Sequence, residues 1–345
     1  MQIYKYVIKI SKFADMKKII FLFFIALTVF SSCETEFNVN SDWKEVMVIY
    51  GLLDQSQDKQ YVRINKAFLG DQDFYVMAAI SDSINYNPEN LEVKIERISS
   101  SGVTLESKIL TDTIMLKENG IFSVDQNIIY VFDTDDFMNQ DKEYKLTVKN
   151  IVTDSIVDSR TRLIHDFNLM SSFNNPSYRM GFFKDNGDFS SSTVEWQQAN
   201  NAGIYQVTLF VKYTEYSTTD TVVRTINKVY PVIKNDGNSD LKQKITGQEF
   251  LSLLKNNIDT SSTKNRRLNN LDILFSAGTT VLNTYIDLNK PPTGIVQERD
   301  MFTNINGGIG LFSARYNKVQ NNIPITTTTK QVIAERLDSL NFIYP

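Results

Sequence analysis

The sequence is poor in the residues from which most catalytic and metal sites are built. Cysteine and histidine each occur once in 345 residues, as Cys33 and His165. One histidine excludes zinc sites that need two or more, and a Ser–His–Asp triad would have to use His165 itself. His165 stands at the expected end of a domain, which is typical of a solvated or core-edge histidine. We predict no catalytic residue, metal site or cofactor, and a protein that is not an enzyme.

A large excess of charge of either sign is also missing. Lys and Arg together number 36 and Asp and Glu 40, which gives a net charge of -4. Because the basic residues form no cluster, nucleic acid is not an expected partner. Glycine (14) and proline (7) are scarce, whereas tyrosine (16) and phenylalanine (22) are abundant, which favours strands over disorder.

No apolar run is long enough to span a bilayer as a helix. Residues 19–30 form an apolar run of about twelve residues, and a spanning helix needs roughly 20. Lys17 and Lys18 precede this run and Ser31-Ser32-Cys33 follows it, as in a secretory signal. The ending resembles the bacterial lipobox, which implies cleavage before Cys33 and acylation of its thiol. An acylated Cys33 leaves no thiol for a disulfide or for a thiolate metal site.

The signal sets the expected organisation of the chain. Residues 1–32 form the signal peptide, with Met16 as the favoured start, and residues 33–45 form a lipidated tether. Glu34 and Glu36 follow the cysteine and resemble the acidic tag of surface lipoproteins in Bacteroidota. We expect a lipid-anchored outer-membrane protein that faces the cell exterior. The mature chain from Cys33 onward, about 310 residues, is long enough for two domains.

The first domain, expected over 46–165, has the pattern of an antiparallel β-sandwich. Val46–Leu53 is an apolar run, and Leu91–Ile98 alternates apolar and charged residues so that one face is dry. Further short strands, including those at 121–124, 144–148 and 153–163, are separated by polar turns. Repeated short strands of this kind predict a sandwich.

The second domain, expected over 166–345, repeats this pattern with a few short helices. A strand at 193–196 and a long strand at 203–213 resemble immunoglobulin-like and fibronectin-like sandwiches, with Trp196 capping the core from the neighbouring strand. Thr246 and Glu249 have the spacing of a capping box and predict a helix.

Three segments near the end of the chain have less regular patterns. Residues 261–270 are polar and basic and are predicted to form a solvated loop, and 280–288 fit either helix or strand. Ile333, Leu337 and Leu340 fall on one face of a predicted last helix.

Two short motifs resemble known ligand sites. Residues 306–310 contain three glycines, but an expected strand at 309–316 follows instead of a helix, so a glycine turn is predicted in place of a phosphate loop. Asp133, Asp135 and Asp136 resemble the start of a calcium loop, but Phe137 occupies a ligand position. A calcium site of another geometry, and a carboxylate pair for glycoside cleavage, stay open.

Three passages together resemble one family. They are Cys33-Glu34-Thr35-Glu36 leading into residues 48–53, the strand at 61–64, and residues 302–312. They are similar to an uncharacterised, domain-of-unknown-function family of Bacteroidota outer-membrane lipoproteins, often encoded beside TonB-dependent receptors. Tyr50 departs from the acidic residue expected there.

This resemblance implies a non-catalytic accessory subunit of a TonB-dependent transport system. Its expected partners are the membrane, through the N-terminal lipid, a TonB-dependent receptor and an unidentified ligand. Two alternatives stay open at this point: an adhesin or pilus-like subunit, and a carbohydrate-active enzyme that uses a carboxylate pair.

Overall fold

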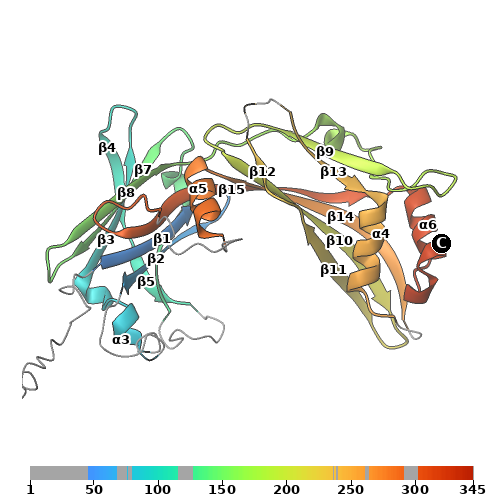
Figure 1. Cartoon of the computed structure of the whole chain (residues 1–345), viewed down its shortest axis with the longest axis horizontal. Helices are drawn as coiled ribbons and strands as arrows, with labels where there is room; N and C mark the ends of the chain where they lie inside the picture. The colour runs from blue at the N-terminus through green and yellow to red at the C-terminus, as the bar shows by residue number, and fades with distance from the viewer. Residues whose placement is uncertain are drawn as a thin grey trace, which may run out of the picture. The chain divides into compact units, whose positions relative to one another are not determined.

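The chain folds mainly into β-strands, and its helices are short (Figure 1). The computed structural model describes residues 46–67, 76, 80–115, 127–235, 237, 240–260, 264–290 and 302–344. All of them belong to one compact unit, Glu45–Pro345, and the other unit, Met1–Lys44, contains none of them. The lipidation of Cys33 and the strand at 121–124 are predictions that lie outside the described residues.

The largest sheet has nine strands in the order β11-β10-β14-β15-β1-β2-β6-β5, with β12 paired to β10. Their bounds are β1 (Val46–Leu53), β2 (Lys59–Ala67), β5 (Thr111–Ile114), β6 (Ile128–Asp133), β10 (Ile204–Tyr216), β11 (Thr221–Val229), β12 (Ile233–Lys234), β14 (Asn265–Gly278) and β15 (Ile309–Pro324). Adjacent strands are antiparallel, except that β1 and β15 are parallel.

Strand β15 pairs with two different strands along its length. Residues 309–314 pair with β1, and most of residues 315–324 pair with β14. The sequence predicted a strand only as far as residue 316. Its second half was missed because several of its residues are exposed and polar, without the alternation that marks a half-buried strand.

Two smaller sheets complete the fold. One has the order β4-β3-β7-β8, and the other pairs β13 with β9. Their bounds are β3 (Leu91–Ile98), β4 (Thr104–Ile109), β7 (Glu143–Asn150), β8 (Ile156–Arg162), β9 (Ser191–Gln197) and β13 (Asp240–Thr246). Each contributes buried side chains to a core that it shares with the large sheet. Sheets that share a core form a sandwich-like arrangement, so the prediction of a mainly β fold is confirmed.

Two hydrophobic clusters fill these layers. The N-terminal core contains buried residues between Met47 and Leu163, together with Ile305, Phe312 and Ala314. The C-terminal core contains buried residues between Ile164 and Phe342. Because β15 contributes side chains to both cores, the domain division at residue 165 stays a prediction.

The helices are short and lie beside the sheets. The α-helices are α3 (Ser81–Ile84), α4 (Gly247–Asn257), α5 (Thr280–Asn289) and α6 (Thr327–Arg336), and the 3-10 helices are η1 (Pro88–Asn90), η2 (Asp135–Phe137), η3 (Ser171–Asn174) and η4 (Asp338–Leu340). In the described part of the chain, no helix has the length and apolar character needed to cross a membrane.

Patterns that depend on near neighbours were predicted correctly. Along β3, Val93 and Ile95 are buried while Glu92 is exposed, as the alternation predicts. The capping box is present, because Thr246 Oγ1 accepts from the Glu249 N–H at 3.2 Å and the Glu249 carboxylate accepts from the Thr246 N–H at 3.1 Å.

The end of the chain departs in part from its predicted helix. α5 settles the open choice at residues 280–288 in favour of a helix. Ile333 is buried on α6, but α6 ends at Arg336, and Leu340 is buried in η4 instead.

The predicted position of the Trp196 strand was wrong in one respect. Strand β9 does not pair with β10, because its partner is β13 in the two-stranded sheet. Trp196 still covers the core, with its ring 5.7 Å from that of Tyr205 and 5.3 Å from that of Phe275. The sequence showed that both strands have a buried face but could not show which strands share hydrogen bonds.

The prediction of a solvated basic loop at 261–270 was also wrong from Asn265 onward, while residues 261–263 lie outside the described residues. Strand β14 begins at Asn265, and Arg266 is only 2% exposed. Its Nε lies 3.0 Å from Glu215 Oε1 on β10, and its Nη1 donates to the Leu340 carbonyl at 2.8 Å. A buried guanidinium requires such partners, and Glu215 is too distant in sequence to be recognised from the local pattern.

Glu215 collects three basic side chains. Besides Arg266, it pairs with Lys264 and with Arg224, each at 3.2 Å. Burial acts to raise the pKa of Glu215, but the hydrogen bonds from Arg266, Lys264 and Arg224 outweigh it and lower the pKa below its usual value. Its charge therefore stabilises the fold above about pH 4.3, the unfolded-state pKa of Glu, and this contribution is lost as pH falls through the lower folded-state pKa.

Glu215→Gln should lower the free energy of unfolding at pH 7 by about 3–5 kcal/mol, because it leaves Arg266 buried without a counter-ion. Urea unfolding measures this, with the exposed Glu195→Gln as the matched control. At pH 3 the difference from wild type should shrink. Equal midpoints for the two variants at pH 7 would contradict the assignment.

Candidate functional site

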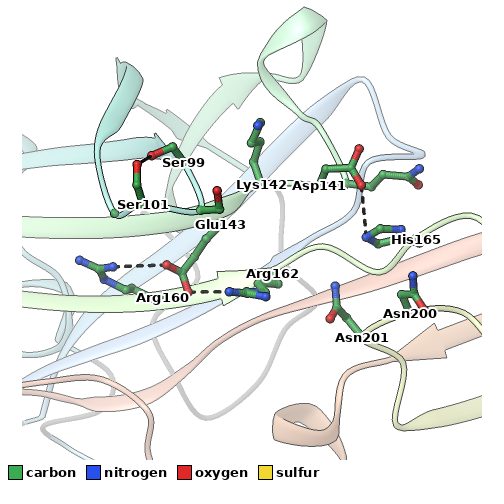
Figure 2. A pocket seen from close by; sticks show the side chains of 13 residues that line it. Ser99, Ser101, Asp141, Lys142, Glu143, Arg160, Arg162, His165, Asn200 and Asn201 are labelled. Carbon is green, nitrogen blue, oxygen red and sulfur yellow. Dashed lines mark hydrogen bonds and ion pairs between the residues drawn. The ribbon is translucent and has the colours of Figure 1, made fainter.

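A polar cavity of about 680 Å³ opens beside the end of β8 (Figure 2). Its lining comes from four places in the chain: the β3–β4 turn, the turn before β7, the end of β8, and the β9–β10 loop. The lining residues are Ser99, Ser100, Ser101, Gly102, Gln140, Asp141, Lys142, Glu143, Arg160, Arg162, His165, Asn200 and Asn201. No Phe, Tyr, Trp or large aliphatic residue is among the lining residues that the structure describes, so the cavity suits a hydrophilic molecule.

Turn chemistry holds two of these segments in place. In the β3–β4 turn, Ser99 Oγ accepts from the Val103 N–H at 3.0 Å, and Gly102 has a φ of 82°, which favours glycine. Before β7, the Asn139 side chain accepts from the Asp141 N–H at 2.9 Å. Both are local side-chain-to-backbone turns of the kind that Ser and Asn promote.

The β7–β8 register brings a carboxylate to two guanidiniums. Glu143 lies opposite Arg162 on the paired strands. Its carboxylate is 3.3 Å from Arg160 Nη1 and 4.0 Å from Arg162 Nε, as the dashed lines in Figure 2 mark. Both arginines are exposed by about half or more, so these pairs contribute about 0–1 kcal/mol each. Their main effect is to place charge on the cavity wall.

Lys142 gives the cavity its uncompensated charge. Three basic residues and two acidic residues line the cavity besides His165. Glu143 pairs with the arginines and Asp141 with His165, whereas no salt bridge of Lys142 occurs among the residues that the structure describes. The cavity therefore favours a ligand that carries negative charge.

His165 lies half-buried at the rim, where a core-edge histidine was predicted. Its Nε2 is 3.7 Å from Asp141 Oδ1, and its backbone N–H donates to the Asn200 carbonyl at 3.1 Å. Figure 2 shows Ser99 and Ser101 across the cavity from His165, and their hydroxyls lie 2.9 Å from each other. Ser99 and Ser101 are therefore not placed to lose a proton to the histidine.

Hydrogen bonds between distant segments fix the rim next to His165. Asn201 Nδ2 donates to the Leu163 carbonyl at 2.8 Å, and Gln55 Nε2 donates to the Ile164 carbonyl at 2.7 Å. The two bonds tie the β9–β10 loop and the β1–β2 turn to the segment that follows β8. These two hydrogen bonds fix the position of the cavity rim relative to both cores.

Asp166 anchors this segment to β15. Its carboxylate accepts from Lys318 Nζ at 2.7 Å and from the Tyr316 hydroxyl at 3.1 Å. Burial acts to raise the pKa of Asp166, but the hydrogen bonds from Lys318 and from the Phe167 N–H outweigh it and lower the pKa. Burial and the Asp166 charge raise the pKa of Tyr316 to about 12, so the phenol stays a donor at neutral pH.

The predicted ligand motifs lie elsewhere in the fold. Asp133 pairs with Lys59 at 2.5 Å and Asp135 with Lys108 at 3.2 Å, so lysines compensate both carboxylates. Over the described ranges, no three His, Cys, Asp or Glu side chains gather as they would around a metal ion.

The glycine-rich motif forms a turn, as predicted. Gly307 has a φ of 76°, and residues from Ile309 onward form β15 in place of a helix. The motif therefore lacks the helix N-terminus that a phosphate loop requires. Cys33 lies outside the described residues.

Sequence reasoning missed the cavity residues because they carry no motif. A signal was nevertheless present: β7 and β8 were both predicted, and pairing them as a hairpin places Glu143 opposite Arg162. The contribution of Asn200 and Asn201 depends on long-range packing, which no local pattern encodes.

Comparisons with known proteins do not indicate a function for this cavity. No protein-family model matches the chain, and no curated protein matches it. Among solved structures, a chain of a cytokine receptor complex is similar over 79% of this chain and 94% of its own length, at 9% identity and a TM-score of 0.23. Similarity at that level carries no argument about fold or function.

An acidic oligosaccharide such as an oligogalacturonate should bind this cavity more tightly than a neutral one such as maltotriose. Lys142→Ala should weaken binding of the acidic probe about tenfold or more, the effect expected for one charge-assisted hydrogen bond. Isothermal titration calorimetry measures both, with Lys149→Ala as the control, because Lys149 is on the strand β7 that follows Lys142 but pairs with Asp154. Equal affinities for the two variants, or no binding of either probe, would contradict the charge assignment.

Proposed function

We propose that this protein is a lipid-anchored, non-catalytic binding subunit of a TonB-dependent transport system at the outer membrane. The observation that carries the proposal is the polar cavity beside His165, which presents amide, hydroxyl and charged groups to a hydrophilic ligand. Binding sites of about 300–1,000 Å³ accommodate small ligands, and this cavity lies in that range.

The partners of the ionisable groups favour binding over catalysis. A glycosidase acid needs surroundings that keep its proton, usually an apolar pocket. Here Glu143 contacts two guanidiniums and Asp141 contacts the imidazole of His165, among polar neighbours. Side chains compensated in this way are suited to hydrogen bonding with a ligand.

The anchor follows from the N-terminal sequence. A diacylated or triacylated Cys33 would hold the protein on a bilayer, because each buried methylene contributes about 0.8 kcal/mol and a single chain binds only marginally. The acidic residues after Cys33 and the resemblance to lipoproteins encoded beside TonB-dependent receptors support a proposed position on the cell exterior next to such a receptor.

Affinity purification of the tagged protein from detergent-solubilised outer membranes should recover a TonB-dependent receptor with it. Mass spectrometry of the mature N-terminus should find Cys33 acylated, because the lipobox directs that modification. Cys33→Ala serves as the control, and it should fail to partition with membranes.

Repeated recovery of the protein alone would contradict the role in transport. An unmodified Cys33 thiol, or full membrane association of Cys33→Ala, would contradict the anchor.

A further inference from the structure

A second cavity, of about 380 Å³, lies in the part of the fold formed by β14, α6 and the last residues of the chain. Three of its lining side chains are basic: Arg179, Arg267 and Lys330. None of its described lining residues is acidic. The cavity thus differs from the polar cavity beside His165, where carboxylates balance most of the basic groups.

The basic side chains come from three separate segments. Arg267 is on β14 next to buried Leu268, Lys330 is on α6, and Arg179 precedes Met180. Arg179 Nη1 donates to the carbonyls of Pro176 at 2.7 Å and Tyr178 at 2.8 Å, which fixes its guanidinium. No salt bridge joins any of the three to an acid within the residues that the structure describes.

Like charges gathered without a counter-ion destabilise one another. Burial, together with the positive charges of Arg267 and Arg179, lowers the pKa of Lys330. An anion held among the three side chains would remove this repulsion and would accept charge-assisted hydrogen bonds from them. Arginine is well suited to this role because its planar fork matches carboxylate and phosphate oxygens.

Apart from Thr327, the rest of the described wall is mostly apolar. Leu268, Ile325 and Phe342 are buried along it, and Pro324, Ile343 and Tyr344 also line it. A purely inorganic anion would leave this surface in contact with water. A ligand with an acidic head and an apolar body would satisfy both halves of the wall.

We propose that this cavity binds a small amphipathic anion, whose carboxylate or phosphate group lies among Arg179, Arg267 and Lys330 and whose apolar part packs on Phe342 and Ile325. The site is separate from the polar cavity and does not depend on the function proposed for it. The chain therefore carries two binding sites of different ligand chemistry.

The test titrates four probes into the full mature protein by calorimetry: octanoate, octyl phosphate, inorganic phosphate and octyl glucoside. The three octyl compounds are kept below their critical micelle concentrations. Octanoate or octyl phosphate should bind at one site per chain. Inorganic phosphate and octyl glucoside should each bind at least about tenfold more weakly, because each lacks one half of the ligand. The tighter of the two anionic amphiphiles identifies the headgroup.

Arg267→Gln/Lys330→Gln should weaken binding of the anionic amphiphile at least about tenfold. Lys242→Gln/Lys244→Gln removes the same charge from exposed positions on β13 and should leave binding unchanged. Arg267→Lys/Lys330→Arg keeps both charges and should restore affinity to within about threefold of wild type. That variant separates loss of the site from loss of the fold.

Three results would overturn the proposal. One is binding of octyl glucoside, or of inorganic phosphate, as tightly as the anionic amphiphiles. Another is an equal loss of affinity in the β13 control and in Arg267→Gln/Lys330→Gln. The third is no saturable binding of any probe.

Discussion

The parallel pairing of β1 with β15 is the contact on which the rest of the described fold depends. Through it, one strand contributes Phe312 and Ala314 to the N-terminal core and Ile323 to the C-terminal core. The pairing requires close backbone approach, since a Cβ on Gly310 would lie 2.0 Å from the Ile49 carbonyl oxygen, and Gly310 has a φ of 118°. Glycine meets both requirements at this position, because it has no Cβ and adopts a positive φ without strain.

Polar bonds at the middle of β15 reinforce that pairing. Asp54, which is 1% exposed at the end of β1, accepts from Arg315 Nε at 3.2 Å and from Asn317 Nδ2 at 2.9 Å. A buried carboxylate is tolerated because these donors, with the Ser56 hydroxyl at 2.5 Å, compensate its charge. Tyr316 and Lys318, on the same part of β15, donate to Asp166. Because Asp166 follows His165, the strand that links the two cores also supports the rim of the polar cavity.

The features predicted correctly from the sequence depend on residues that are close together in the chain. The burial of Arg266 and the polar cavity were missed because both depend on residues that are far apart in the chain. The alternation in β3 and the Thr246–Glu249 capping box need only a few adjacent residues. Arg266 was assigned to a solvated loop because its counter-ion, Glu215, is fifty-one residues away in the chain. The cavity was missed for the same reason, since His165 gains its neighbours Asp141 and Asn200 only through long-range packing.

Hydrogen exchange of the β15 amides tests most directly whether this strand unites the two cores. The account predicts that amides in residues 309–314 and those in 315–324 that bond to β14 exchange together, at the rate set by global unfolding. Faster exchange of the first half, with the second half still protected, would show that the β1 pairing opens independently and would contradict the account.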